Sequence, residues 1–583
     1  MPGMKKILRT RDVPAIPDEL KGTHPVLARL YAARGVESAD QLVRNLQGLH
    51  KPLLKGMETA LDLLETALRE NRRILIVGDF DADGATSTVL AVRALRAMGA
   101  AQVDYLVPNR FTYGYGLTPE IVGLAYATKS PDLIMTVDNG ISSIEGVAAA
   151  NALGMQVLIT DHHLPGAVLP NAAAILNPNQ PGCDFPSKHL AGVGVAFYLL
   201  SRLRTQLKEQ GWFAEKNIPE PVMADYLDLV ALGTVADVVP LDANNRVLVH
   251  QGLARIRAGR CCPGITALLA IAGKNPAQLV ATDLGFQVAP RLNAAGRLDD
   301  MSHGIECLLT DSPDLASQFA AELDGLNVER RQIEGNMQNE AMHVLKTFTL
   351  DKAALPFGLA LFHRDWHQGV IGILAGRLKE RFHRPVIAFA PAAAGSDELK
   401  GSARSIPGVH IRDVLDAVAA RNPGLITRFG GHAMAAGLAL PAMHLEDFRT
   451  AFNAAVRDVV DPRDLEPVLY SDGELPAECF TEPFADILRE AGPWGQAFPE
   501  PLFHGDFHCL EQRLLKEKHL KMSVAHPASN RVFDAIAFNI DPAQWPNKAR
   551  KVRLAYRLDI NEFRGSRSLQ LRVEYLEPVE DAI

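Results

Sequence analysis

The sequence predicts an α/β protein with a parallel-sheet domain, a second and smaller α/β domain joined to it by a long helix, and a C-terminal β domain. Three observations support this fold class. Short apolar runs alternate with helical patterns between residues 73 and 177. Residues 312–348 carry apolar side chains at helical spacing without a strand signal. From about residue 462, short segments alternate between apolar and polar residues and are separated by Gly, Pro and Asn.

The parallel-sheet domain is expected over residues 71–311, after a helical segment at residues 1–70. Residues 73–80 (RILIVGDF) predict a buried strand, and residues 84–99 predict the helix that follows it. Further short apolar runs predict strands at residues 103–108, 133–138, 157–161 and 173–177. Strands that alternate with helices are typical of a doubly wound sheet. The chain is then expected to be mostly helical from about residue 192 to residue 304.

The rest of the chain predicts a helix and two further domains. Residues 312–349 are expected to form one long helix, and residues 350–461 the second α/β domain. The expected elements of that domain include strands at residues 358–363 and 385–390 and a helix at residues 370–382. The alternating pattern of residues 462–583 favours a small β-barrel or a sandwich.

The composition limits the class of protein. A chain of 583 residues with 47% hydrophobic and 22% charged residues is typical of a globular protein with several domains. No apolar stretch is long enough to span a bilayer and no apolar signal core follows Met1, so we expect a cytoplasmic protein without a membrane partner. The six cysteines are scattered without a C-x-x-C pair, which argues against a zinc site and favours reduced thiols. The net charge of −8 argues against a uniformly basic surface.

Acidic and histidine side chains follow four of the apolar runs. The sets are Asp79, Asp81 and Asp83 after the first strand, Asp138 after a later one, Asp161, His162 and His163 after residues 157–160, and Asp237 after a further apolar run. Side chains just past buried parallel strands meet at one rim of the sheet. A single such residue is more often a helix cap or a turn residue, but four sets together predict a site for two divalent metal ions.

The residue types at this rim suit Mg²⁺ or Mn²⁺. Hard divalent cations prefer carboxylate oxygens, and an imidazole shifts the preference towards Mn²⁺. Two cations about 3.5 to 4 Å apart need a bridging carboxylate, for which we favour Asp138. Such a pair can activate water on one side of a phosphorus atom and stabilise the leaving oxygen on the other. The expected ligands are Asp79, Asp81, Asp83, Asp138, His162 and Asp237.

Four segments carry a resemblance to a known family. VGDFDADGATS, VDNG, DHH and GTVADVVPL occur in this order and resemble the four motifs of the DHH phosphoesterase superfamily. GGHAMAAG resembles its DHHA1 companion domain. With RLNAAGR, HQGVIGILAGRL and the C-terminal β domain, residues 70–580 are similar to the RecJ-type exonucleases of this superfamily. The resemblance implies a DHH domain, a DHHA1 domain and an OB-like barrel.

The resemblance also implies an activity. RecJ-like enzymes degrade single-stranded DNA from 5′ to 3′ and release 5′-mononucleotides, using two Mg²⁺ or Mn²⁺ ions, in recombination and repair. Single-strand-binding protein and a helicase are implied as partners. In the superfamily, Asp161 and His163 match residues that support the metal site. Asp79 falls where many relatives have another ligand, often His, and His163 either contacts the scissile phosphate, which we favour, or orients its neighbours.

Several residues are expected to bind the nucleic acid. Arg404, Ser405, Gly431 and His432 lie on glycine-rich loops whose amides can approach phosphate oxygens. Arg291, Asn293 and Arg297 are expected to flank a cleft between the two α/β domains, although basic residues at such positions are more often solvated. A basic C-terminal set predicts a single-strand binder, and it includes Arg513, Lys516, Lys518, Lys521, Lys548, Arg550, Lys551, Arg553, Arg557, Arg564 and Arg567. A small-substrate phosphodiesterase or a catalytically inactive DNA scaffold are the alternatives.

Overall fold

The computed structural model describes residues 6–109, 113–348, 355–393, 395–529, 531–563 and 566–579. The chain forms two compact units. One comprises Val13–Asn327 with Leu488–Glu500, and the other comprises Met1–Asp12, Val328–Ile487 and Pro501–Ile583. Among the described residues, no helix has the length and apolar character needed to cross a membrane.

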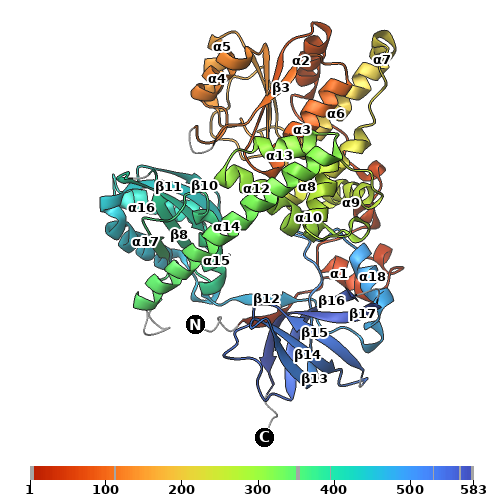
Figure 1. Cartoon of the computed structure of the whole chain (residues 1–583), viewed down its shortest axis with the longest axis vertical. Coiled ribbons are helices and arrows are strands. Elements are labelled where there is room, and N and C mark those ends of the chain that lie inside the picture. The colour runs from red at the N-terminus through yellow and green to blue at the C-terminus, as the bar shows by residue number, and fades with distance from the viewer. Residues whose placement is uncertain are drawn as a thin grey trace. The chain divides into compact units, whose positions relative to one another are not determined.

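The first unit contains a five-stranded parallel sheet (Figure 1). Its order is β3-β2-β4-β5-β6. The strands are β2 (Ile74–Gly78), β3 (Val103–Leu106), β4 (Leu133–Val137), β5 (Gln156–Thr160) and β6 (Ala174–Leu176). All five predicted strands are therefore confirmed. β2 and β4 are buried along their whole length, which explains why they are apolar throughout instead of alternating.

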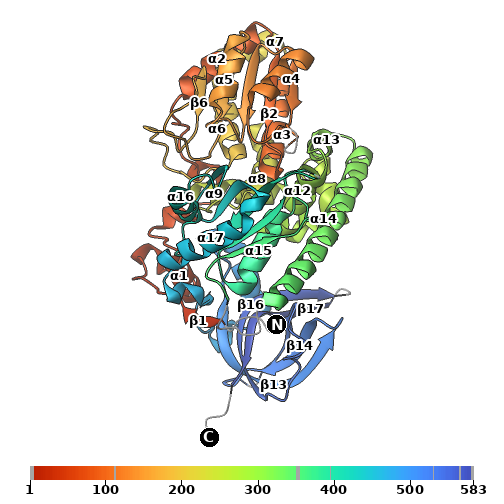
Figure 2. The same cartoon turned by 90° about the vertical axis from the view of Figure 1, so that its left-hand side faces the viewer.

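Helices cover both faces of this sheet (Figures 1 and 2). Leu75 and Val77 of β2 pack in one apolar cluster with α4 (Pro119–Lys129) and α5 (Ile144–Ala152). Ile74 and Ile76 point to the opposite face. They join the cluster formed with α2 (Met57–Arg69), α3 (Ala82–Ala97) and α6 (Gly192–Glu209). The predicted doubly wound arrangement is thus confirmed.

The helical part of this unit follows the sheet, as predicted for residues 192–304. Its further helices are α7 (Trp212–Lys216), α8 (Leu227–Ala236), α9 (Ala243–Arg257), α10 (Pro263–Ile271), α11 (Ala281–Asp283), α12 (Ala289–Leu298) and α13 (Ser302–Leu309). A π-helical segment, Leu284–Val288, leads into α12. The N-terminal α1 (Pro25–Ala32) and α2 contribute Tyr31 and Leu64 to the same apolar cluster as α3.

The predicted long helix is α14 (Pro313–Phe348), which has 36 residues. It begins in the first unit and ends in the second. Within the second unit, Glu334 of α14 pairs with Arg330 at 2.9 Å and with Arg377 of α15 (Ile371–Phe382) at 3.0 Å. The last predicted residue of the helix, 349, lies outside the described residues, as do residues 350–354 of the domain expected to follow it.

The second α/β domain has a mixed five-stranded sheet in the order β10-β11-β9-β8-β7. Only β7 and β8 are parallel to each other. The strands are β7 (Leu359–Phe362), β8 (Val386–Pro391), β9 (Glu398–Arg404), β10 (Arg428–Gly431) and β11 (Ala435–Pro441). Ile387 and Phe389 of β8 pack with α16 (Ile411–Arg421) and α17 (Leu445–Val459). The predicted strands and helix of this domain are confirmed.

The C-terminal β domain is a closed barrel in the order β13-β14-β15-β17-β16 (Figure 2). The strands are β13 (Phe503–Leu515), β14 (His519–Ala525), β15 (Val532–Ala537), β16 (Lys551–Phe563) and β17 (Ser566–Pro578). Phe507 packs edge-on against Tyr556 inside it, with centroids 5.5 Å apart. A short helix, α18 (Glu482–Glu490), precedes the barrel. The sequence did not predict β1 (Ile7–Thr10), which pairs in parallel with β12 (Val468–Ser471).

Candidate metal centre

The ends of three neighbouring strands bring the predicted acidic residues together. Gly78 of β2 pairs with Val137 of β4, and Val137 pairs with Thr160 of β5, so the three strands end at the same level. The residues that follow them are Asp79, Asp138 and Asp161, and all three are buried. The backbone N–H of Asp138 donates to the carbonyl of Thr160 at 3.0 Å, which continues the ladder up to the site.

Two helix N-termini fix the carboxylates after β2. Asp81 is the N-cap of α3, and its Oδ1 accepts hydrogen bonds from the amides of Asp83 and Gly84 at 2.9 and 3.1 Å. Asp83 is 1% exposed. Its Oδ2 accepts from the amide of Gly192 at 2.6 Å and its Oδ1 from that of Val193 at 3.0 Å, both at the start of α6. The positive end of the α6 dipole therefore faces the carboxylate.

Two glycines allow the helices to approach this closely. A Cβ on Gly192 would lie 2.5 Å from the Cβ of Asp138. A Cβ on Gly233 of α8 would lie 2.3 Å from Oγ1 of Thr86 and 2.8 Å from Oδ1 of Asp83. Because α8 packs so tightly on α3, the residue after it, Asp237, reaches the site. The sequence predicted Asp237 at a strand end; that was wrong, because the apolar run before it is a buried helix.

The side chains form three overlapping groups whose ligand atoms lie within 4.8 Å of one another. The groups are Asp79 with Asp81 and Asp138, Asp138 with His162 and His163, and Asp83 with His162 and Asp237. Nε2 of His162 lies 3.1 Å from Oδ1 of Asp138 and 3.4 Å from Oδ2 of Asp237. Asp138 and His162 each belong to two groups, so ions held by neighbouring groups would share ligands.

The electrostatics of the cluster call for a cation. Burial, and then the charge of Asp81, raises the pKa of Asp83 to about 7. Burial and the neighbouring carboxylates raise the pKa values of Asp138 and Asp237 well above their ordinary value. The buried Oδ1 of Asp138 accepts no hydrogen bond from any described residue. Hard oxygen donors with one imidazole fit Mg²⁺ or Mn²⁺, and a bound cation would offset the repulsion.

Asp161 serves His163 rather than a cation. Its Oδ1 accepts from the amides of His162 and His163 at 2.7 and 3.1 Å and lies 2.8 Å from Nδ1 of His163, and its Oδ2 accepts from the amide of Ile141 at 2.9 Å. Burial lowers the pKa of His163, but the hydrogen bond and charge of Asp161 outweigh it and raise this pKa to about 9. Asp161 therefore favours the protonated form of His163.

The segment around α12 holds the loop after β2 in place. Oδ1 of Asn293 accepts a hydrogen bond from the amide of Ala82 at 2.8 Å. A Cβ on Gly296 would lie 1.8 Å from the carbonyl oxygen of Phe80, so α12 lies directly against this loop. Arg291, predicted to bind substrate, is buried and its Nε pairs with Asp324 at 2.8 Å.

A second predicted cluster lies in the other unit. Strand pairing brings its members together, since Ala435 pairs with Arg404 and Ala436 pairs with Gly431. Ser405 is buried, its amide donates to the carbonyl of Met434 at 2.9 Å, and its hydroxyl donates to the carbonyl of Val409 at 2.6 Å.

Two other residues predicted to bind substrate, His432 and Arg297, are at least partly exposed. His432 follows Gly431, which has a φ of 143° that disfavours a side chain there. Arg297, on α12 in the first unit, is half-buried. The second cluster thus forms a corner of the mixed sheet, with backbone turns suited to glycine.

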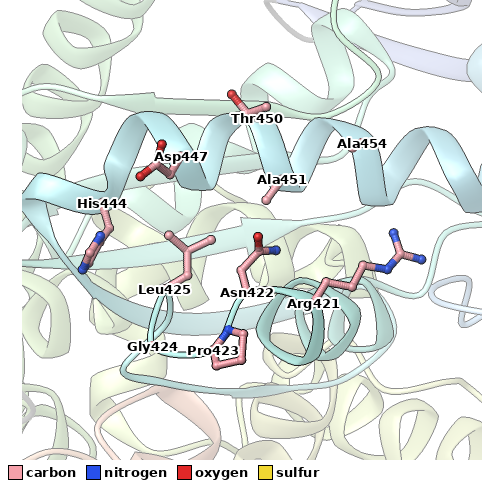
Figure 3. A pocket seen from close by; sticks show the side chains of 10 residues that line it. All are labelled: Arg421, Asn422, Pro423, Gly424, Leu425, His444, Asp447, Thr450, Ala451 and Ala454. Atoms are coloured by element: carbon pink, nitrogen blue, oxygen red, sulfur yellow. The ribbon is translucent and has the colours of Figure 1, made fainter.

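A groove of about 710 Å³ in the same domain holds none of the predicted residues (Figure 3). It lies between the segment after α16 and α17, and is lined by Leu425, Asn422, Ala451 and their neighbours. Asp447 is its sole lining carboxylate among the described residues. This groove is therefore not the predicted phosphate site.

Ion pairs neutralise part of the basic set on the barrel. Four cations have acidic partners within the barrel unit, namely Lys521 with Asp534, Arg553 with Asp506, Arg557 with Glu574 and Arg567 with Asp486. Lys551 also lies 3.9 Å from Asp506. Five exposed cations form no ion pair within the described part of the chain: Arg513, Lys516, Lys518, Lys548 and Arg550. Arg564 lies outside the described residues.

Sequence reasoning missed Tyr115 in the loop before α4. Its hydroxyl lies 3.3 Å from both ring nitrogens of His163 and 3.4 Å from the carbonyl of Asp138. The glycines on either side, Gly114 and Gly116, have φ values of 79° and 76°. A Gly-Tyr-Gly sequence signals a fixed turn, but nothing in it signals that the turn faces β5.

The chain matches three family models. They are the DHH family N-terminal domain over residues 73–234, the DHHA1 domain over residues 355–458 and the RecJ OB domain over residues 471–575. The single-stranded-DNA-specific exonuclease RecJ of Dickeya dadantii is 56% identical over 99% of this chain and 100% of that protein. The protein of the same name from Escherichia coli is 55% identical over 98% of this chain and 99% of its own length.

Solved structures agree with this relationship. The crystal structure of RecJ in complex with Mn²⁺ from Thermus thermophilus has a TM-score of 0.80 and 30% identity, and covers 99% of this chain and 80% of that chain. The complex with Mg²⁺ has a TM-score of 0.74. The predicted fold class and divalent cofactor are thereby confirmed. With its DHH domain, the chain is a metal-dependent nuclease that hydrolyses phosphodiester bonds. It belongs to the RecJ family of single-stranded-DNA-specific exonucleases.

Proposed function

We propose that this protein degrades single-stranded DNA from 5′ to 3′ and releases 5′-mononucleotides by two-metal hydrolysis. The observation that carries the proposal is that two ligand groups, Asp79 with Asp81 and Asp138, and Asp83 with His162 and Asp237, meet where Nε2 of His162 lies 3.1 Å from Oδ1 of Asp138. Two adjoining groups of ligands favour a pair of ions over a single ion. The names of the relatives support single-stranded DNA as the substrate.

The cation pair would be held by Asp81, Asp83, Asp138, His162 and Asp237, with Asp79 completing one of the groups. When bound, two such ions polarise the phosphate and make water acidic enough to act as the nucleophile. Asp138, shared between groups, is the candidate bridge. The amides of α6 keep Asp83 oriented whichever ion is present.

His163 is assigned to the scissile phosphate. Asp161 keeps it protonated and fixes its ring, so its cationic N–H can bind a non-bridging phosphate oxygen as negative charge develops there. Asp161 itself has both oxygens engaged by the backbone and His163, which suits a positioning role. Asn293 has a similar role for the loop after β2.

The other domains are assigned to the DNA strand. We retain residues 71–311 as the catalytic domain, with the helical segment 1–70 before it and the helix 312–349 after it. Residues 350–461 and 462–583 then hold the substrate. Arg404, Ser405, Gly431 and His432 form a corner suited to phosphate oxygens, and Arg297 is assigned to the strand near α12. We expect Arg291 to bind the strand more weakly than Arg297, because its Nε is already paired with Asp324.

The cellular setting is proposed from the family resemblance. We assign the protein to recombination and repair in the cytoplasm, where single-strand-binding protein and a helicase would supply unpaired strands. A nuclease that acts only on single-stranded DNA requires such strands.

The test is digestion of a single strand labelled at its 5′ or its 3′ end, with Mn²⁺ or with EDTA. The proposal expects early release of a labelled mononucleotide from the 5′ end only, and none with EDTA. Cleavage of dinucleotides with long strands left intact would replace it by a small-substrate phosphodiesterase. Binding without cleavage under any metal would make the protein a scaffold.

A further inference from the structure

Tyr115 lies beside the metal centre in the loop before α4. Gly114 and Gly116 both adopt a left-handed backbone conformation, with φ of 79° and 76°. After them the amide of Leu117 donates to the hydroxyl of Ser143 at 3.1 Å, and a Cβ on Gly116 would lie 3.1 Å from the same hydroxyl. Ser143 directly precedes the first residue of α5, so these contacts attach the loop to the start of that helix.

The two ends of the Tyr115 side chain have different surroundings. The hydroxyl lies between the ring of His163 and the carbonyl of Asp138. The ring makes edge contacts with His163 and Phe80, with centroids 5.8 and 6.1 Å apart. Even so, the residue is 49% exposed. Almost half of the surface of Tyr115 is therefore accessible to a partner, which is unusual for an aromatic residue with a satisfied polar end.

We propose that the ring of Tyr115 is the platform on which a base next to the scissile phosphate stacks, while its hydroxyl positions His163. The inference rests on the proposed function, because it places the phosphate at His163. A base lies one sugar away from its phosphate, and the ring of Tyr115 lies next to that of His163, with centroids 5.8 Å apart. Stacking suits an enzyme that consumes any sequence, since every base has a π face.

The hydroxyl adds a second, separable role. Nδ1 of His163 faces Asp161 at 2.8 Å, and the Tyr115 hydroxyl lies 3.3 Å from both ring nitrogens, so it contacts the imidazole between them and leaves the N–H of Nε2 for the phosphate. This contact limits rotation of the imidazole without adding charge. Removing the ring should therefore affect strand binding, whereas removing the hydroxyl alone should affect turnover.

The experiment is a thermodynamic cycle in which protein variants are each measured with normal DNA strands and with strands that lack one base. Tyr115→Leu removes the ring and Tyr115→Phe removes only the hydroxyl. The matched control is Tyr126→Leu on α4, because Tyr126 has the same 49% exposure and no described contact with the cluster. Strands carry an abasic site at the first, second or tenth nucleotide. Affinity is measured by fluorescence anisotropy in Ca²⁺, kcat and KM in Mn²⁺, and folding by thermal melting.

For the wild type, an abasic site at the first or second nucleotide should weaken binding about 5- to 150-fold, the range for loss of one stacked base. Tyr115→Leu should weaken the normal strand by a similar factor and then lose nothing more with the abasic strand. Tyr115→Phe should bind normally and lower kcat about 2- to 10-fold. Tyr126→Leu and the tenth-position abasic site should have no effect.

The inference is overturned if the losses from Tyr115→Leu and from the abasic site multiply, since independent effects mean no contact. It is also overturned if folded Tyr115→Leu binds and cleaves as the wild type does. Failure of the proposed function looks different. In that case the wild type itself releases no mononucleotide from a normal strand.

Discussion

Replacing Gly192 with alanine should disable the metal centre through a single methyl group. The new Cβ would lie 2.5 Å from the Cβ of Asp138, 2.8 Å from its Oδ1 and 2.9 Å from its Cα. Carbon atoms pack at about 3.5 to 4.0 Å, so Asp138 must move by about 1 Å. Rotation of the side chain cannot relieve the clash, because the Cα of Asp138 is also too close.

A displacement of about 1 Å at a reacting centre costs about 10²-fold in rate. The same crowding should destabilise the fold by about 1 to 3 kcal/mol, which a protein of this size tolerates. The amide of residue 192 would also be pushed from Asp83, to which it now donates at 2.6 Å. We therefore expect kcat to fall about 100-fold or more while the protein remains folded.

The assay is kcat/KM for release of mononucleotides from single-stranded DNA in Mn²⁺, with the melting temperature measured in parallel. Gly194→Ala is the control in the same helix. Its Cβ would contact only the side chain of Leu190, and the nearest atom, Cδ2 at 3.1 Å, can move away. A folded Gly192→Ala protein with a rate within about 3-fold of the Gly194→Ala protein would refute this reasoning.

Three further predictions concern the loop after β2, the buried acids and the barrel. Asn293→Ala leaves the amide of Ala82 without its acceptor, so urea unfolding should show a loss of about 1 to 3 kcal/mol in the free energy of unfolding, and an unchanged free energy would contradict this role. The pKa of Asp83 is raised from 3.8 to about 7, so in the absence of metal this residue stabilises the fold when it is protonated. Its contribution to the free energy of unfolding is fully present below pH 4 and is lost as the pH rises through 7. Mn²⁺ should therefore raise the melting temperature more at pH 8 than at pH 5.5, and Asp83→Asn should reduce that difference; an equal gain at both pH values would contradict it. Lys518→Ala should lower the slope of log affinity against log salt by about 0.7, whereas Arg553→Ala, which is already paired with Asp506, should change it less; equal effects would be inconsistent with our assignment.

The sequence was sufficient to predict the strands of the parallel sheet and the residues at their ends. β2 and β4 are buried on both faces, so their apolar runs are continuous and their ends are sharp. The order of strands in a parallel sheet then brings the following residues to one edge. For this reason Asp79, Asp138 and Asp161 could be grouped without any knowledge of distances.

Contacts between distant segments could not be predicted in this way. Asp237 reaches the cluster because Gly233 lets α8 pack closely on α3, and an apolar run alone does not distinguish a buried helix from a strand. The pairing of Arg291 with Asp324 depends on how α14 lies along α12. Tyr115 depends on the path of a loop, which local sequence patterns do not specify.

The most direct test of the account compares hydrolysis and binding in Asp138→Ala, measured side by side in Mn²⁺. The account predicts that release of mononucleotides from single-stranded DNA is abolished while affinity for the strand stays measurable. This follows because Asp138 belongs to two of the three ligand groups, whereas the barrel and the second α/β domain are assigned to the strand. Hydrolysis by this variant at the rate of the wild-type protein would contradict the account.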